Sequence, residues 1–427
     1  MTEAFRTWML LRELRTNVHA RPESLSAVQD RLLRRAVAHA AAHVPFYRQF
    51  WPERGFHAAG FRGLDDLERI PIVDGETMKQ AARKGELLAQ GWDASACTFL
   101  DSSGSSGAST RIWKKPLEER VRRATGLRIW FEHGFRWRDV TAQFQILSGP
   151  SLLLQRLGIS RKTWISTAQS PEVQRAQFLA AAADVVVGTP TALRGICQAL
   201  RSGGTSWARP RVVFAAGELV DRATRETVSR VLGVEPVAIY GQTEVGYLAW
   251  QCERRQAFHL NADTHLVEVR RQDAPAAPGT LGRVVVTDLR GRTMPFLRYD
   301  TGDLAIAGLG PCACGRSLPT LQSLEGRAQG TFTLASGAIL TTRQLVDALV
   351  GAIPLGWFRV EQIASQEFCL VCLDRVDELQ RQAALAILRD LLGEGVVRTA
   401  SVAGWRADGT GKTDTVSSAV PLGGELS

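Results

Sequence analysis

The chain has 427 residues, of which 45% are apolar and 22% charged, a composition typical of a globular protein with one large and one smaller domain. It has neither an apolar run of about 18 residues nor the pattern of a signal peptide, so we expect no membrane span and a cytoplasmic location. The net charge of +9 comes mostly from scattered arginines, which excludes a basic nucleic-acid-binding tail but leaves room for a cleft that attracts a phosphorylated ligand.

The N-terminal third is predicted to be helical up to a stretch rich in serine and glycine. Leu25, Leu32 and Ala36 share one stripe of a helix expected over 24–43, which Ser24 would cap. Shorter helical pieces are expected over 61–90. The stretch LDSSGSSGASTR then lies between a strand-like CTFL and an aromatic IW. Its composition fits either a flexible linker or a backbone cradle for anionic oxygens.

The middle of the chain alternates strands and helices. Strands are expected at 184–188, 211–218 and 236–244. Thr189 and Asp221 are placed to cap the intervening helices, and Gly233 to end the second. Such alternation predicts a largely parallel sheet, whose ligands bind at the carboxyl ends of the strands. The loops SSGSSG, GE and YGQTE would then converge on one crevice.

The last third changes character. Antiparallel strands are expected over 281–289 and 295–308. A helix, two strands, a helix and a strand then follow, at 342–351, 357–363, 368–374, 376–392 and 396–403. The predicted fold class is α/β. A large domain, residues 1–327, holds mainly parallel sheets flanked by helices and a small antiparallel region; residues 328–427 form a small, mobile α+β domain.

The seven cysteines do not suggest a disulfide framework, because their number is odd and the expected compartment is reducing. Three thiols and one imidazole, from Cys252, His259, Cys312 and Cys314, could make a structural zinc site. The spacing alone fits buried free cysteines equally well. Cys97, Cys197, Cys369 and Cys372 lie on strand or helix patterns and are expected in the core.

Five ordered motifs carry a family resemblance: DSSGSSGAST (101–110), AAGE (215–218), YGQTEVG (240–246), LRYDTGDL (297–304) and EGR (325–327). Together they resemble the adenylate-forming superfamily, most closely its phenylacetate–CoA ligase and capsular-polysaccharide-type branch. HVPFYRQF, CERRQAFHLNADTHLVEV and CACGR are similar to the same branch. The resemblance implies a large nucleotide-binding domain, a hinge and a mobile C-terminal domain, and it favours structural zinc.

The resemblance assigns roles to residues of these motifs. Ser102, Ser103, Gly104, Ser105, Ser106 and Gly107 would hold the leaving phosphates of ATP. Glu244 would bind Mg²⁺ and Thr243 the α-phosphate. Tyr240 and Gly241, with Gly217 and Glu218, would surround the adenine. Asp303 would accept hydrogen bonds from the ribose hydroxyls, and Arg327 would lie at the hinge.

The resemblance also implies a catalytic lysine and a set of acceptors. Lys412, in the C-terminal GK segment, would stabilise the adenylation transition state. The expected reaction activates a small carboxylic acid and transfers it to a thiol, coenzyme A. Gln329 stands where the family has an acidic hinge residue, so an amine or carrier-protein acceptor stays open, as do a catalytically silent scaffold and a homodimer.

The acid-binding pocket is the least defined part of the prediction. Tyr247 and Trp250 directly follow the nucleotide motif, and aromatic walls there would favour an aryl acid. Trp130, Phe131 and Trp137 are further aromatic candidates, although aromatic residues at such spacing are more often core.

Overall fold

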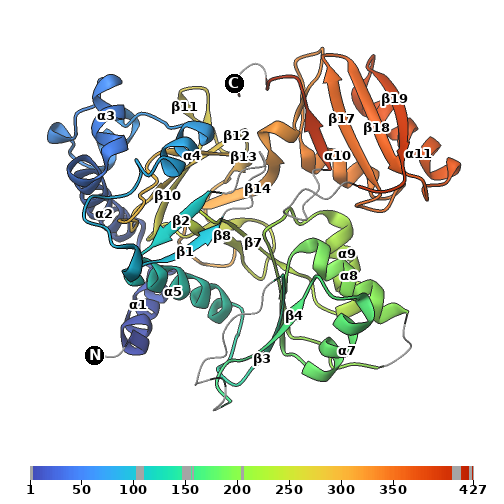
Figure 1. Ribbon diagram of the computed structural model, residues 1–427, viewed down its shortest axis with the longest axis horizontal. Coiled ribbons are helices and arrows are strands. Elements are labelled where there is room, and N and C mark those ends of the chain that lie inside the picture. The colour runs from blue at the N-terminus through green and yellow to red at the C-terminus, as the bar shows by residue number, and fades with distance from the viewer. Residues whose placement is uncertain are drawn as a thin grey trace. The chain divides into compact units, whose positions relative to one another are not determined.

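The structure, a computed structural model, describes residues 3–101, 110–146, 155, 158–202, 206–405, 415–422 and 426. The chain divides into two compact units. The first contains residues 1–125, 242–248 and 259–427, and the second contains residues 126–241 and 249–258. Figure 1 traces the chain through both. No helix among the described residues is both long and apolar enough to cross a membrane.

The first unit begins with helices, in the order α1 (Glu3–Asn17), α2 (Pro22–His43), α3 (Pro45–Glu53), η1 (Ala58–Gly60), η2 (Leu64–Arg69), α4 (Gly75–Arg83) and η3 (Ala94–Ala96). The helix predicted over 24–43 is confirmed and ends before Pro45. The predicted Ser24 cap is wrong. Arg21 occupies the cap position without a side-chain bond, and Pro22 supplies a φ already suited to the first turn.

An antiparallel sheet follows these helices in the first unit. Its strands are ordered β11 (Ala274–Pro275), β10 (His265–Arg271), β12 (Leu281–Asp288), β13 (Tyr299–Ala307) and β14 (Thr320–Arg327). The prediction of antiparallel strands over 281–289 and 295–308 is therefore confirmed. Register shifts interrupt the pairing on both sides of β13, and such bulges re-aim the side chains beside them.

The segment before β13 is held by the N-terminal helices. The Tyr47 hydroxyl donates to the carbonyl of Pro295 at 2.9 Å and accepts from the backbone N–H of Leu297 at 2.9 Å. The Arg298 guanidinium donates to the carbonyl of Ile70 at 2.5 Å. Val73 and Tyr299 form an isolated parallel bridge. The entry of the chain into β13 is thus fixed by residues more than 200 positions earlier.

The second unit contains the predicted parallel sheet. Its strands are ordered β7 (Val237–Gln242), β6 (Val212–Ala216), β5 (Val185–Gly188), β3 (Val140–Gln145) and β4 (Arg161–Ser166), accompanied by α7 (Pro171–Ala181), α8 (Pro190–Arg201) and α9 (Arg222–Leu232). Figure 1 shows α8 and α9 side by side. Thr189 and Asp221 cap these helices as predicted, and Gly233 ends α9 with φ +79°.

Several further elements connect the chain: β1 (Thr98–Asp101), β2 (Arg111–Lys114), α5 (Pro116–Glu132), β8 (Gly246–Gln251) and β9 (Phe258–Leu260). β1 and β2 pair antiparallel, with Asp101 opposite Arg111. The division between the units passes through α5 and through the hairpin of β8 and β9.

The C-terminal part of the first unit has a mixed sheet of its own, ordered β19 (Val396–Val402), β18 (Glu367–Leu373), β17 (Phe358–Ala364) and β20 (Val416–Ser418). Also in this part are η4 (Ala328–Gly330), β15 (Phe332–Thr333), β16 (Ile339–Leu340), α10 (Thr342–Leu349) and α11 (Glu378–Leu392). An apolar core over 332–416 joins them. The predicted α+β composition is confirmed; the boundary at 327 stays a prediction.

Candidate active site

Two groups of predicted site residues, Ser102–Gly107 and Lys412, lie outside the described residues. The strands on either side of the first group are described. Arg111 Nε lies 2.9 Å from Asp101 Oδ1, and these two residues are partners in the pairing of β1 with β2. The pairing holds together the two ends of the predicted phosphate loop.

Asp303 lies on β13, opposite Arg327 on β14. Its Oδ1 is 2.9 Å from Arg327 Nε, and its Oδ2 accepts a hydrogen bond from Gln242 Nε2 at 2.8 Å. The Asp303 side chain is 14% exposed and that of Arg327 is 50% exposed. Charge-assisted bonds to both oxygens fix the orientation of this carboxylate. We call Asp303, Arg327 and Gln242 the Asp303 cluster.

Gln242 is a site residue that the sequence analysis missed. It lies inside YGQTE, between residues assigned to the nucleotide, and is separated from Asp303 by 61 positions. A polar side chain in the middle of a nucleotide motif was the available signal. The strand pairing that brings the two residues together is long-range, so local pattern could not reveal their contact.

Tyr299 is buried beside the Asp303 cluster. Burial raises the pKa of its phenol, and the negative charge of Glu244 raises it further, ahead of that of Asp303. Because Tyr299 stays a neutral phenol, it adds no charge of its own. The charges of Glu244 and Asp303 thus both act on Tyr299.

Thr243 and Glu244 form the turn that joins β7 to β8, followed by Gly246 with φ +90°. The main-chain carbonyl of Glu244 accepts a hydrogen bond from Lys114 Nζ at 3.1 Å. The half-buried Glu244 carboxylate has no hydrogen-bond or ion-pair partner within the part of the chain that the structure describes. A carboxylate left open in this way suits a hard cation.

In the second unit, Gly217 and Glu218 follow β6. Gly217 has φ +87°, a conformation that favours glycine. Glu218 Oε2 accepts from the backbone N–H and the hydroxyl of Thr191, at 3.0 and 2.7 Å. Glu218 therefore stabilises the N-terminus of α8. Tyr240, on β7, is buried at 8% exposure.

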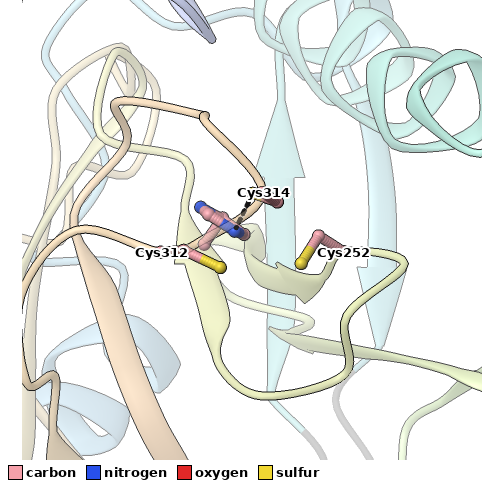
Figure 2. Close-up of side chains that lie close together, drawn as sticks. Cys252, Cys312 and Cys314 are labelled. Carbon is pink, nitrogen blue, oxygen red and sulfur yellow. Dashed lines mark hydrogen bonds between the residues drawn. The ribbon is translucent and has the colours of Figure 1, made fainter.

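The predicted zinc ligands lie together. The ligand atoms of Cys252, His259, Cys312 and Cys314 are all within 4.8 Å of one another. Figure 2 shows the three cysteines drawn together, and its dashed line marks the 3.3 Å contact of Cys314 Sγ with His259 Nε2. Cys252 and His259 are buried. Three thiols and one imidazole that converge in this way match the donor set of a closed structural zinc site.

The aromatic residues proposed for an acid pocket pack mainly against one another. Trp130 stacks on Phe214 with ring centroids 5.7 Å apart, and Phe131 contacts Trp137 at 4.9 Å. Trp250 is fully buried, with its ring edge against His133. These contacts favour a core role for Trp130 and Trp250, whereas Trp137 is 45% exposed. Tyr247 differs, because it lines a cavity in the first unit.

Known structures share the fold of this chain. The 2-hydroxyisobutyryl-CoA ligase, solved in the postadenylation state in complex with R3-HIB-AMP, superposes with a TM-score of 0.75 at 19% identity, over 94% of this chain and 91% of the other. The chain therefore has the α/β fold of an adenylate-forming ligase, as the sequence predicted.

Sequence comparison finds phenylacetate–coenzyme A ligases that are similar to this chain. The chain is 29% identical to the phenylacetate–coenzyme A ligase of Thermus thermophilus, over 78% of this chain and 76% of the relative. It is 25% identical to the Escherichia coli phenylacetate–coenzyme A ligase, over 77% and 76%. No family model matches. The chain is thus similar to phenylacetate–coenzyme A ligases over about three quarters of its length, so the expected resemblance is confirmed; its capsular-polysaccharide part stays a prediction.

Proposed function

We propose that this protein is an ATP- and Mg²⁺-dependent carboxylic acid ligase. In the first step, a carboxylate oxygen of the acid attacks the α-phosphorus of ATP and pyrophosphate leaves. In the second step, the sulfur of a thiol, coenzyme A, loses its proton and attacks the acyl carbon, and AMP leaves. Homology to phenylacetate–CoA ligases supports this assignment. The observation that carries it is the Asp303 cluster beside the open carboxylate of Glu244.

The proposed roles of Asp303, Glu244 and Thr243 follow from the charge and polarity of their side chains. Asp303, held by Gln242 and Arg327, would present its oxygens to the ribose hydroxyls, as a fixed acceptor can. Glu244 would hold Mg²⁺, which neutralises phosphate charge when bound. Thr243, in the same turn, would donate to the α-phosphate. Donors fixed before the reaction cost little reorganisation when charge develops.

The remaining assigned residues lie in other segments. Tyr240, Gly241, Gly217 and Glu218 would surround the adenine, Glu218 also keeping its bonds to α8. Ser102–Gly107 would hold the leaving phosphates. Lys412 would be carried by a small mobile domain, residues 328–427. We assign Cys252, His259, Cys312 and Cys314 to structural zinc, because a four-ligand closed site leaves no position for substrate.

The proposed function is tested by pyrophosphate exchange into ATP over a panel of aryl and aliphatic acids, with and without Mg²⁺. We expect exchange that requires both an acid and the cation. The second step is then tested by offering coenzyme A or an amine and measuring which one consumes the adenylate. Transfer to the amine alone would favour the amide-forming alternative, and no exchange with any acid would favour a silent scaffold.

The lysine assignment has its own test. We expect Lys412→Ala to lower the rate of adenylate formation by about 100-fold or more, because a cation that stabilises a developing charge is lost. Thioester formation from a preformed acyl adenylate should stay near the wild-type rate. Unchanged exchange by the variant would show that Lys412 is a surface residue without a catalytic role.

A further inference from the structure

A small cavity in the first unit lies beside the Glu244 turn. Its volume is about 20 Å³, enough for one water molecule or one small polar group. Val245 and Tyr247, which directly follow the turn, line one side. Lys114 and Arg122, from β2 and α5, line another. The cavity is therefore next to the residues assigned to adenylation, and charged side chains are among those that line it.

Lys114 is a buried cation that lacks a counter-ion among the described residues. It is 7% exposed, and its ammonium group makes one hydrogen bond in that part of the chain, to the main-chain carbonyl of Glu244. An ammonium group carries three donors, so two remain for the cavity. Buried charges are normally paired, because leaving water without compensation is costly. The Lys114 ammonium therefore needs a further hydrogen-bond acceptor, which the described residues do not supply.

The nearest acids are already engaged. The Glu118 carboxylate accepts from the backbone N–H groups of Lys115, Arg292 and Thr293, and from the Thr293 hydroxyl. Asp288 Oδ1 accepts from the backbone N–H groups of Arg290 and Gly291. Neither carboxylate lies within ion-pair distance of the Lys114 ammonium.

The other polar groups of the wall do not neutralise Lys114 either. Arg122 is itself a cation, held by Glu119 at 2.5 Å. Burial lowers the pKa of His265, whose Nε2 lies 2.9 Å from the carbonyl of Val245. A neutral imidazole with one ring nitrogen on that carbonyl offers no negative charge. Of the three cations that line the cavity, Arg122 and Arg290 are paired with Glu119 and Glu13. Lys114 has no acid within ion-pair distance among the described residues.

We propose that the acid substrate is a dicarboxylic acid, whose second carboxylate is bound by Lys114 in this cavity. The inference rests on the proposed function, since it names the substrate of the same site. Only a terminal group fits the cavity, so the body of the acid lies outside it while the other carboxylate is activated near Glu244. The ammonium group of Lys114 would then have two roles, since it would hold the Glu244 turn and also bind the second carboxylate of the substrate.

The experiment compares matched pairs of acids by pyrophosphate exchange with the full chain. Phenylacetate is paired with 4-carboxyphenylacetate, and butanoate with succinate. We expect kcat/KM at least about 10-fold higher for one diacid than for its partner. Lys114→Met should lower kcat/KM for that diacid by about 10- to 100-fold, the effect of one hydrogen bond to a charged group. The loss for the monoacid should be clearly smaller, since that acid loses only the support that Lys114 gives to the Glu244 carbonyl.

Lys115→Met is the matched control, because it removes the same charge one residue away and outside the cavity. It should keep the preference for the diacid, and Lys114→Arg should restore part of it. Equal losses for both acids in Lys114→Met would overturn the proposal and leave Lys114 a positioning residue for the Glu244 carbonyl.

The wild-type ranking decides the proposal even if Lys114→Met does not fold. Activity without any preference for a diacid, or a preference for hydroxylated over carboxylated acids, would contradict this inference and leave the ligase assignment standing. No pyrophosphate exchange with any acid would instead contradict the ligase assignment itself.

Discussion

The Asp303 cluster and the cavity lined by Lys114 differ in how their charged groups are paired. Both oxygens of Asp303 are bonded to side chains of the protein, from Gln242 and Arg327. The Lys114 ammonium has one neutral carbonyl as its partner among the described residues. The first arrangement holds a group in place before a ligand arrives. The second leaves part of a charge for the ligand to satisfy.

We expect the Asp303 cluster to contribute to ATP binding with every acid substrate. We expect Lys114 to contribute to the selection of one acid over another. A carboxylate fixed by its neighbours contributes equally whichever acid is present, so it should affect the use of ATP. A cation that lacks an acceptor gains most from the one ligand that supplies it. Substitutions in the two regions should therefore have different kinetic signatures.

The largest expected effect is that of Asp303→Ala. Removing the carboxylate takes the proposed ribose acceptor away and breaks the bonds of Asp303 with Gln242 and Arg327, so we expect kcat/KM for ATP to fall by about 100- to 1000-fold. The fall should be the same for every acid, which contrasts with Lys114→Met. Asp347→Ala, which breaks an ion pair with Arg343 on α10, is the control. A loss that depends on the acid would remove the distinction between the two regions.

The predicted zinc ligands, Cys252, His259, Cys312 and Cys314, belong to neither region, so their substitution serves as a reference for effects on stability alone. If they hold zinc, one metal ion per chain should be found by elemental analysis. Cys312→Ser should then release it and lower the midpoint of thermal unfolding by about 5 °C or more, because a bound metal stabilises the folded state. The preference among acids should be unchanged. Full stability in a chain shown to lack metal would refute a structural role.

The smallest expected effect concerns the wall of the cavity. The folded-state pKa of His265 is lowered by burial, so below about pH 6.5 the unfolded chain binds a proton that the folded chain does not. The stability from this group is complete above that pH and is lost as pH falls through the folded-state pKa. We expect His265→Gln to reduce the loss between about pH 6.5 and 5.5 by up to about 1 kcal/mol. Denaturant unfolding at both pH values measures it.

The matched control for that measurement is His57→Gln, the same substitution at an exposed position. Parallel curves for the wild type and His265→Gln would show that the buried imidazole does not contribute to it.

Much of the fold could be predicted because its signals are local. Thr189 and Asp221 bond to backbone N–H groups three residues ahead, and Gly233 ends α9 in a left-handed conformation. Ser24 misled for the same reason, since a good capping residue stood two positions inside a helix that began at Pro22. β20 was missed: three residues become a strand by pairing with β17, more than 50 positions earlier.

The site was predictable in its motifs but not in its connections. Asp303 and Glu244 lie in recognisable sequences, whereas the bond from Gln242 to Asp303 depends on tertiary structure. Lys114 carried no signal in the sequence, because a lysine at the end of a short strand is usually on the surface. Its meaning comes from burial and from the carbonyl of Glu244, neither of which local spacing reveals.

The fastening of the segment before β13 by Tyr47, Ile70 and Val73 limits how this protein can be shortened. A version that starts after these residues would keep every nucleotide motif yet lose the supports that set the path of the strand bearing Asp303. The opening helices would thus support the proposed nucleotide site, although none of their own residues was assigned a ligand.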